Sequence, residues 1–317
     1  MKPAEPIHPR LLRRLGVDAD EHPRGQAHLS AASGLVCSSG RVYVVADDEH
    51  HLGIFSSLDA AGELHRIVPG DLPEGIKARK KRKPDLECLL RWPDPARGET
   101  SSKSHSKSSG LLALGSGSRP NRERGWWIAL RADGRPAGAA AAIDFRPLYQ
   151  PLRAELGVVN IEGAVLVGDE VLLLNRGVNG RGNATVRYRR KDLQRLIDGA
   201  DAAISPIHIE HHDLGALAGV PLGFTDGAAL PDGGWLYSAV AEVTDNSVDD
   251  GACAGSVIGR IDAAGRCIWQ RPLADVIKVE GVDVHVSGAD LTICLVTDAD
   301  DPKQASGLYT ARIPQRC

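Results

Sequence analysis

The sequence has 317 residues, of which 42% are hydrophobic and 25% are charged, and its formal net charge is −3. This charge gives no general attraction to nucleic acid or to anionic membranes, and the hydrophobic content is sufficient for a folded core. The first residues, MKPAEPIHPRLLRRLG, lack the apolar segment of a secretory signal, and no run of 18 uncharged apolar residues could cross a membrane. We therefore expect a soluble, cytoplasmic protein. Its six cysteines, which have no CxxC or other metal-ligand spacing, should be mostly reduced.

One pattern recurs along the chain: a small or acidic residue, usually a glycine after it, a short apolar strand, a turn, a second strand and a polar end. The copies are AASGLVCSSGRVYVVADDE, PDLECLLRWP continued by GLLALGSGSR, NIEGAVLVGDEVLLLNRG, FTDGAALPDGGWLYSAVAE and KVEGVDVHVSGADLTICLVTDAD. Their anchoring residues are Ser33, Glu87, Glu162, Asp226 and Glu280. A repeat of about 40–60 residues built from short strands is typical of a β-propeller, in which each blade is a four-stranded sheet.

Further hairpins follow each strand pair, such as HLGIFSSLDAAGELHRIV and SVIGRIDAAGRCIWQRPL, with DG or AG at the turns. The sequence therefore predicts an all-β protein whose single domain, residues 1–317, is a five-bladed propeller. The approximate blades are 31–70, 84–153, 158–215, 222–274 and 277–314. The fifth unit ends after GLYTARIP, so we expect an amino-terminal strand, HPRLLRRLGV, to complete it and remove an exposed sheet edge. A sixth blade within 98–150 and a pair of β-sandwiches are the alternatives, but the internal periodicity favours five blades.

Three polar segments interrupt the pattern. The Ser/Lys-rich residues 93–110 predict a flexible insert, and residues 193–203 predict one short helix. The run KARKKRKP, residues 77–84, is typical either of a nucleic-acid or nuclear-targeting patch or of a solvated loop between blades. The near-neutral charge of the whole chain favours the loop, so we expect neither a nucleic-acid nor a membrane partner.

The repeated acids point to a site. The first strand of each propeller blade lines the central channel, so Glu87, Glu162, Asp226 and Glu280 should ring one mouth of it. Four converging carboxylates raise one another's pKa values unless a cation compensates them. Ca²⁺, which accepts six to eight oxygen ligands, fits this set, and no His/Cys spacing indicates zinc. The alternative is that the acids are structural and accept backbone N–H groups at the strand starts.

The polar strand ends would complete the site. Arg119, Arg122 and Arg176 should reach the same rim, where a guanidinium suits a phosphate or carboxylate, and Asn175 stands beside Arg176. Asp48 or His50 could act as general base, with Glu162 in the reacting set. The strand IHIEHHDL is expected on the outer surface. Together these residues predict a metal-dependent hydrolase of a small anionic ester, that is a phosphoester, ester or lactone.

The ordered set SGL, DLE, GSGSRPNR, NIEG, LNRG, TDG and KVEG resembles an uncharacterised bacterial propeller family akin to the esterase-like phytase-related and SdiA-regulated propellers. The likeness covers about residues 30–312. It implies a propeller fold and a calcium-dependent hydrolase, since related propellers of the gluconolactonase group hold a divalent metal at the channel mouth. Two departures, Ser33 in place of an acid and Cys88 in place of glycine after Glu87, imply an asymmetric ring.

Two other functions use the same mouth. It could bind a small ligand or a partner peptide without chemistry, or the acids could serve a scaffold. A fold that serves both enzymes and binding proteins does not decide between them.

Overall fold

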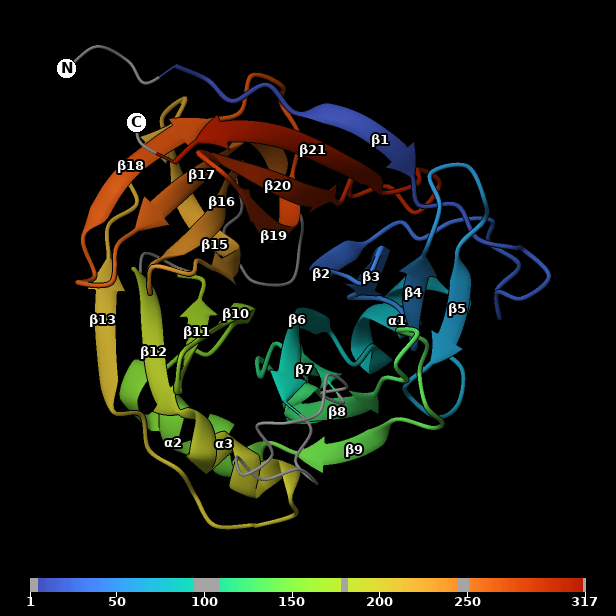
Figure 1. The fold of residues 1–317 in the computed structure, drawn as a ribbon. Coiled ribbons are helices and arrows are strands. Elements are labelled where there is room, and N and C mark those ends of the chain that lie inside the picture. The colour runs from blue at the N-terminus through green and yellow to red at the C-terminus, as the bar shows by residue number, and fades with distance from the viewer. Residues whose placement is uncertain (1–4, 94–108, 178–181, 244–250, 316–317) are drawn as a thin grey trace.

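The computed structural model describes residues 5–93, 109–177, 182–243 and 251–315, and its strands form five antiparallel sheets around a central axis (Figure 1). The predicted insert 93–110 falls almost wholly outside these residues. In blades one to three the strands follow one another outward from the axis in chain order. Blade one consists of β2 (Ala32–Ser38), β3 (Arg41–Ala46), β4 (His51–Phe55) and β5 (Glu63–Arg66), and blade two of β6 (Leu86–Pro93), β7 (Ser109–Gly115), β8 (Arg124–Ala129) and β9 (Ala141–Asp144). Blade three consists of β10 (Ile161–Val167), β11 (Glu170–Asn175), β12 (Asn183–Arg189) and β13 (His208–His212).

Blade four has one additional short strand, and blade five takes its outer strand from the amino terminus. Blade four consists of β14 (Ala216–Leu217), β15 (Val220–Ala229), β16 (Trp235–Val243), β17 (Ala252–Ile261) and β18 (Cys267–Pro272), and blade five of β19 (Val279–Ser287), β20 (Asp290–Thr297), β21 (Gly307–Pro314) and β1 (Arg10–Arg14). The five-bladed propeller predicted from the repeat is confirmed.

The amino-terminal segment closes the ring, as predicted. Strand β1 pairs antiparallel with β21, with Arg10 opposite Thr310 and Arg14 opposite Gly307. Just before β1, Ile7 forms a parallel bridge with Leu273 of blade four, and just after it Val17 bridges Gly62 of blade one. One segment therefore joins three blades, which leaves β21 without an unpaired edge.

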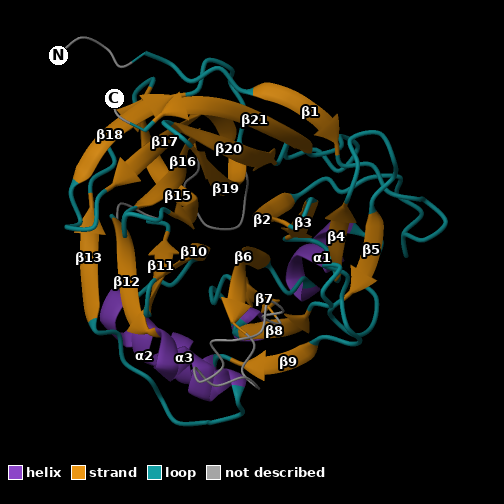
Figure 2. Ribbon diagram, viewed as in Figure 1, coloured by secondary structure: helices purple, strands orange, loops and turns teal. Residues whose placement is uncertain are grey.

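Two of the helices lie together at the periphery on one side of the ring, and a third lies nearer the centre (Figure 2). The helices α2 (Arg146–Leu156) and α3 (Arg190–Ile197) pack apolar residues such as Tyr149 and Leu193 between blades two and three. Helix α3 overlaps the predicted helix at 193–203, whereas α2 was not predicted. None of the helices in the described part of the chain is long and apolar enough to cross a membrane.

The basic run 77–84 is not a solvated loop as expected. It forms helix α1 (Ile76–Arg82), and its Arg79 side chain is buried. Arg79 Nε donates to Asp48 Oδ2 at 3.0 Å, and Arg79 Nη1 donates to the carbonyl oxygen of Glu74 at 2.8 Å. The helix forms because this arginine has fixed partners at the end of blade one, while Lys77, Lys81 and Arg82 remain exposed.

Candidate functional site

Each innermost strand breaks its pairing register near its start. In blade three, Ile161 pairs with Asn175 and Gly163 with Leu174, so Glu162 has no partner in the ladder. A bulge of this kind leaves the unpaired residue free to point away from the sheet. The unpaired residues of the five blades are Ser33, Glu87, Glu162, Thr225 and Glu280.

Blade four corrects the predicted ring. Its bulge residue is Thr225, and Asp226 pairs opposite Ser238. A shift of one residue turns a side chain to the other face of a strand, so Asp226 leaves the channel mouth. Its carboxylate accepts a hydrogen bond from the backbone N–H of Val282 at 3.0 Å and joins blades four and five. Burial raises the pKa of Asp226 well above its usual value. Aligning the TDG of blade four with the IEG of blade three by their common glycine placed Asp226 one residue out of register with the acids of the other blades.

The channel mouth follows from strand alternation. Because side chains two residues apart share a face, the residue two before each bulge also lines the mouth. These residues are Ala31, Asp85, Asn160, Gly223 and Lys278. The residues between them and the bulges are fully buried and apolar: Ala32, Leu86, Ile161, Phe224 and Val279.

In four blades the second strand ends beside the start of the innermost strand, at the channel mouth. Backbone N–H groups just past this strand donate to the carbonyl oxygens of the residues two before the bulge. The donor and acceptor pairs are Asp47 and Ala31 at 3.0 Å, Ser116 and Asp85 at 3.0 Å, Arg176 and Asn160 at 2.9 Å, and Asp298 and Lys278 at 3.1 Å. Repeated backbone geometry therefore places Asp47, Arg176 and Asp298 at the pocket, with side chains that differ from blade to blade.

The resulting pocket has a volume of about 710 Å³. Among the described residues, eleven acidic and six basic side chains line it. Blade four contributes four uncharged residues, Gly223, Val240, Leu222 and Pro221, together with the acidic Glu242. A Cβ at Gly223 would lie 2.8 Å from Nε of Arg176, so the Arg176 side chain packs directly against this glycine.

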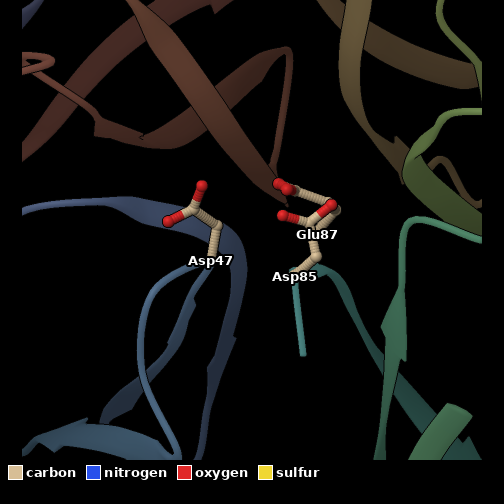
Figure 3. A group of neighbouring side chains, drawn as sticks. All are labelled: Asp47, Asp85 and Glu87. Carbon is tan, nitrogen blue, oxygen red and sulfur yellow. The ribbon is translucent and has the colours of Figure 1, made fainter. Parts of the chain in front are cut away.

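Three carboxylates converge at the junction of blades one and two. Oxygen atoms of Asp47, Asp85 and Glu87 all lie within 4.8 Å of one another, and Asp47 faces the other two across the blade boundary (Figure 3). Lys83 Nζ contacts Asp47 and lies 2.9 Å from Asp85. No hydrogen bond or ion pair joins the Glu87 side chain to another residue of the described part of the chain. Glu87 is thus the open member of the cluster.

Glu87 and Asp47 have raised pKa values. Burial raises the pKa of Glu87 well above its usual value, and the carboxylates of Asp85, Glu162 and Asp47 add to the rise while Lys83 opposes it. Burial likewise raises the pKa of Asp47 to about 6, against the charge of Lys83. A proton or a further cation near Glu87 would relieve this repulsion.

Glu162 lies beside this cluster with its own partners. Asn160 Nδ2 donates to Glu162 Oε1 at 2.5 Å, and Arg176 Nη1 is 3.8 Å from Glu162 Oε2. Burial raises the pKa of Glu162 to about 8; Arg176 opposes the rise and Glu280 adds to it. Glu162 is therefore largely protonated at neutral pH and can donate a proton into the pocket.

A buried lysine balances the acids of blades four and five. Lys278 Nζ is 2.6 Å from Asp300, 3.4 Å from Glu242 and 3.4 Å from Glu280. Lys83 and Lys278 were both missed in the sequence, although each lies two residues before an acid that it contacts, Asp85 and Glu280.

Comparison with known proteins identifies the chain at the level of a family. Residues 28–313 match the "Family of unknown function (DUF6929)". The chain belongs to this family. No curated protein matches the sequence.

Solved structures show that the DUF6929 chain shares the propeller fold with proteins of very different sequence. A glycoside hydrolase family 43 arabinoxylan arabinofuranohydrolase from Bacillus subtilis aligns with a TM-score of 0.50 and 11% identity, over 94% of this chain and 66% of that one. Regucalcin from Agrobacterium tumefaciens, a calcium-binding protein, aligns with a TM-score of 0.42 and 10% identity, over 100% of this chain and 98% of that one. At these identities the likeness concerns the fold alone.

The pocket of the DUF6929 chain contains six of the ten site residues proposed from the sequence. They are Asp48, Glu87, Arg122, Glu162, Arg176 and Glu280. Asp48 is held by Arg79 at 3.0 Å and by Arg24 at 3.6 Å. Arg122 is buried, and its Nη1 donates to Asp85 at 2.7 Å. Arg176 Nη2 pairs with Glu242 at 2.6 Å.

The other four proposed residues lie away from the pocket. Besides Asp226, they are His50, Arg119 and Asn175. His50 Nδ1 contacts the carbonyl oxygen of Gly70 at 2.8 Å. Arg119 precedes the 3₁₀ turn Pro120–Arg122. Asn175 Oδ1 accepts the backbone N–H of Asn160 at 2.8 Å, so it fixes the strand that carries Glu162.

One histidine of the strand IHIEHHDL, which was expected on the outer surface, lines the pocket. His212 lies at the end of β13, the outer strand of blade three, yet it lines the pocket. Its Nε2 is 2.9 Å from Oγ1 of Thr185. Its chain neighbours Asp213, Leu214 and Gly215, which lead into blade four, line the pocket with it.

Proposed function

We propose that this pocket binds a divalent cation, with Ca²⁺ as the best fit, and hydrolyses a small anionic ester. The observation that carries the proposal is Glu87: a pocket carboxylate with no hydrogen bond or ion pair to another described residue, whose oxygen lies within 4.8 Å of oxygens of Asp47 and Asp85. Three carboxylates with no nitrogen or sulfur ligand form a donor set for a hard cation.

The fit of these residues to a cation depends on Lys83. Its ammonium already contacts Asp47 and Asp85, whereas Glu87 is left to the pocket. A divalent cation on this cluster would rest mainly on Glu87 and would compete with Lys83 for the other two carboxylates. Bound there, it would polarise a carbonyl or phosphoryl oxygen of the substrate.

Protons and substrate are handled by the neighbouring side chains. Glu162, with its pKa raised to about 8, is our candidate for the acid that protonates the leaving group. Arg122 and Arg176 are our candidates for holding the anion. Both are paired with protein carboxylates, so the anion would share them with Asp85 and Glu242. Asp48 is held between two arginines, which makes it a positioning residue in this proposal.

Two further considerations bear on the proposal. The resemblance to the esterase-like phytase-related and SdiA-regulated propellers implies the same class of activity. The internal pairing of Lys83, Arg122, Arg176 and Lys278 favours a second candidate, a propeller that binds a small polar ligand without turning it over. In that case the fixed charges would serve recognition alone.

The test combines binding and turnover. Chelator-treated protein is unfolded thermally with millimolar Ca²⁺, Mg²⁺ or Mn²⁺, and hydrolysis of p-nitrophenyl phosphate, p-nitrophenyl acetate and γ-butyrolactone is measured under the same conditions. A cation that binds only the folded protein raises the unfolding midpoint. We expect a Ca²⁺-selective rise that Glu87→Gln abolishes and that the control Glu155→Gln, on the exposed face of α2, retains. A midpoint unmoved by every cation, together with no turnover, would leave the ligand-binding candidate.

A further inference from the structure

A pair of thiols lies where the first and last blades meet. Cys37 is near the end of β2 in blade one, and Cys294 is in β20 of blade five. Cys37 follows the bulge residue Ser33 by four positions, which places it roughly 13 Å along the strand from the pocket end. The pair therefore belongs to the other end of the blade junction and takes no part in the proposed site.

Three contacts bring these cysteines together. The Cys37 N–H donates to Oδ2 of Asp283 at 2.6 Å. Asp283 lies directly opposite Cys294 in the β19–β20 ladder, so the carboxylate that binds the Cys37 backbone is the cross-strand neighbour of Cys294. Both side chains also pack against one hydrophobic cluster that contains Leu35 and Leu308.

The two thiols are chemically unequal. Both are free cysteines in the structure, and both residues are only partly buried. The neighbouring Cys37 lowers the pKa of the Cys294 thiol, whereas the neighbouring Cys294 and burial raise the pKa of Cys37. The thiolate is the reactive form of cysteine, so Cys294 should react first.

We propose that Cys37 and Cys294 form a reversible disulfide that joins blade five to blade one when the protein meets a peroxide. The sulfur of Cys294 attacks one peroxide oxygen, the O–O bond breaks, and the second oxygen leaves as water, which gives a sulfenic acid at Cys294. The sulfur of Cys37 then attacks the Cys294 sulfur, the S–S bond forms, and the S–O bond breaks to release a second water. Two thiols lose two electrons and two protons, and hydrogen peroxide is reduced to two waters.

The bond would reinforce the closure that β1 provides. It would link strands far apart in the chain, and a long closed loop restricts the unfolded chain strongly. We therefore expect the unfolding midpoint of the oxidised protein to rise by roughly 5 °C. The described cysteines Cys253 and Cys267 lie outside this pair, so they serve as internal comparisons.

The experiment uses the reduced full-length protein and a small excess of hydrogen peroxide. Free thiols are then alkylated, and the protein is digested without reduction for mass spectrometry. We expect a peptide with residue 37 linked to one with residue 294, a loss of two titratable thiols, and reversal of both by dithiothreitol. Cys37→Ser and Cys294→Ser should each abolish the linked peptide and the midpoint rise, and Cys267→Ser should retain both.

Two results would overturn the proposal. One is separate alkylation or over-oxidation of Cys37 and Cys294 with no linked peptide. The other is a midpoint rise that persists in Cys37→Ser. Neither result depends on cation binding or turnover, so this proposal and the proposed hydrolase stand or fall separately.

Discussion

Lys83 Nζ lies 2.9 Å from a carboxylate oxygen of Asp85 and also contacts Asp47, so one ammonium of the protein neutralises two pocket acids. Their neighbour Glu87 has no such bond within the described chain. Two carboxylates of the cluster, Asp47 and Asp85, therefore already have a cationic partner, whereas Glu87 has none at bonding distance among the described residues. Removal of Lys83 should change this balance.

Replacing Lys83 by Met should weaken the protein and strengthen cation binding. The substitution leaves the Asp47 and Asp85 carboxylates without their partner, which should cost about 3 kcal/mol of the free energy of unfolding in the absence of metal. The same carboxylates become available to Ca²⁺, so the rise in unfolding midpoint on adding Ca²⁺ should exceed that of the wild type. The measurement is thermal unfolding with a chelator and with Ca²⁺.

Lys77→Met is the matched control, because Lys77 is exposed on the same helix, α1. It should change neither the stability nor the response to Ca²⁺ by a measurable amount. A Lys83→Met protein whose midpoint responds to Ca²⁺ no more than the wild type would remove this cluster as a metal site.

Because of Glu162, the free energy of unfolding should fall as the pH rises from acid to neutral. Its pKa is raised from 4.5 to about 8, so between these values the folded protein holds a proton that the unfolded chain releases. The stability that it contributes is complete below pH 4.5 and is lost as the pH rises toward 8, with a slope of at most about 1.4 kcal/mol per pH unit.

Glu162→Gln removes this titration. The variant should therefore gain stability relative to the wild type as the pH rises from 5 to 8, whereas Glu155→Gln should follow the wild type throughout. Urea unfolding at several pH values measures the difference. A constant difference between wild type and Glu162→Gln over this range would show that Glu162 ionises normally in the folded protein.

The sequence predicted the scaffold better than the site. The repeat gave the number of blades, and the short fifth unit gave the closing strand β1, because both follow from local strand patterns and the need to pair a sheet edge. Four of the five bulge residues were identified as well. The error at Asp226 is one residue in register, which a shared glycine cannot resolve.

The rest of the site depends on distances between segments far apart in the chain. The pairing of Arg176 with Glu242 joins blades three and four, and that of Arg79 with Asp48 joins α1 to blade one. A charge pattern shows that such groups occur but not which of them meet. Lys83 and Lys278 are the exceptions, because each lies two residues before an acid that it contacts, which was a usable local signal.

Glu49 should stabilise the amino-terminal segment at neutral pH. Its carboxylate is 3.0 Å from His22 Nε2 and 2.5 Å from Arg24 Nη2. Burial would raise its pKa, but the hydrogen bond with His22, the proximity of His51 at 3.9 Å and the charge of Arg24 outweigh burial and lower the pKa from 4.5 to about 2. The stability contributed by this ionised group is present above pH 4.5 and is lost as the pH falls toward 2.

Glu49→Gln should therefore cost about 3 kcal/mol at pH 7, and less at pH 3. Denaturant unfolding at the two pH values measures both costs. Glu63→Gln, at an exposed pair with Arg135, should cost less than about 0.5 kcal/mol at either pH. An equal cost of Glu49→Gln at both pH values would mean that packing, not the charge, carries the effect.

Gly163→Ala should separate blades three and four. The glycine follows the bulge at Glu162, and an added Cβ would lie 2.6 Å from Cα of Asp226, where only backbone could give way. Two other blades are built alike, since a Cβ at Gly34 would lie 2.7 Å from the Leu89 nitrogen and one at Gly281 would lie 2.6 Å from the Ser33 oxygen. We expect a loss of about 1–3 kcal/mol in the free energy of unfolding, measured by urea unfolding.

Gly16→Ala is the control, because its Cβ would meet nothing closer than the Ala27 oxygen at 3.6 Å. If both variants unfolded at the wild-type urea concentration, the close approach of the innermost strands would not be what the glycine after the bulge provides.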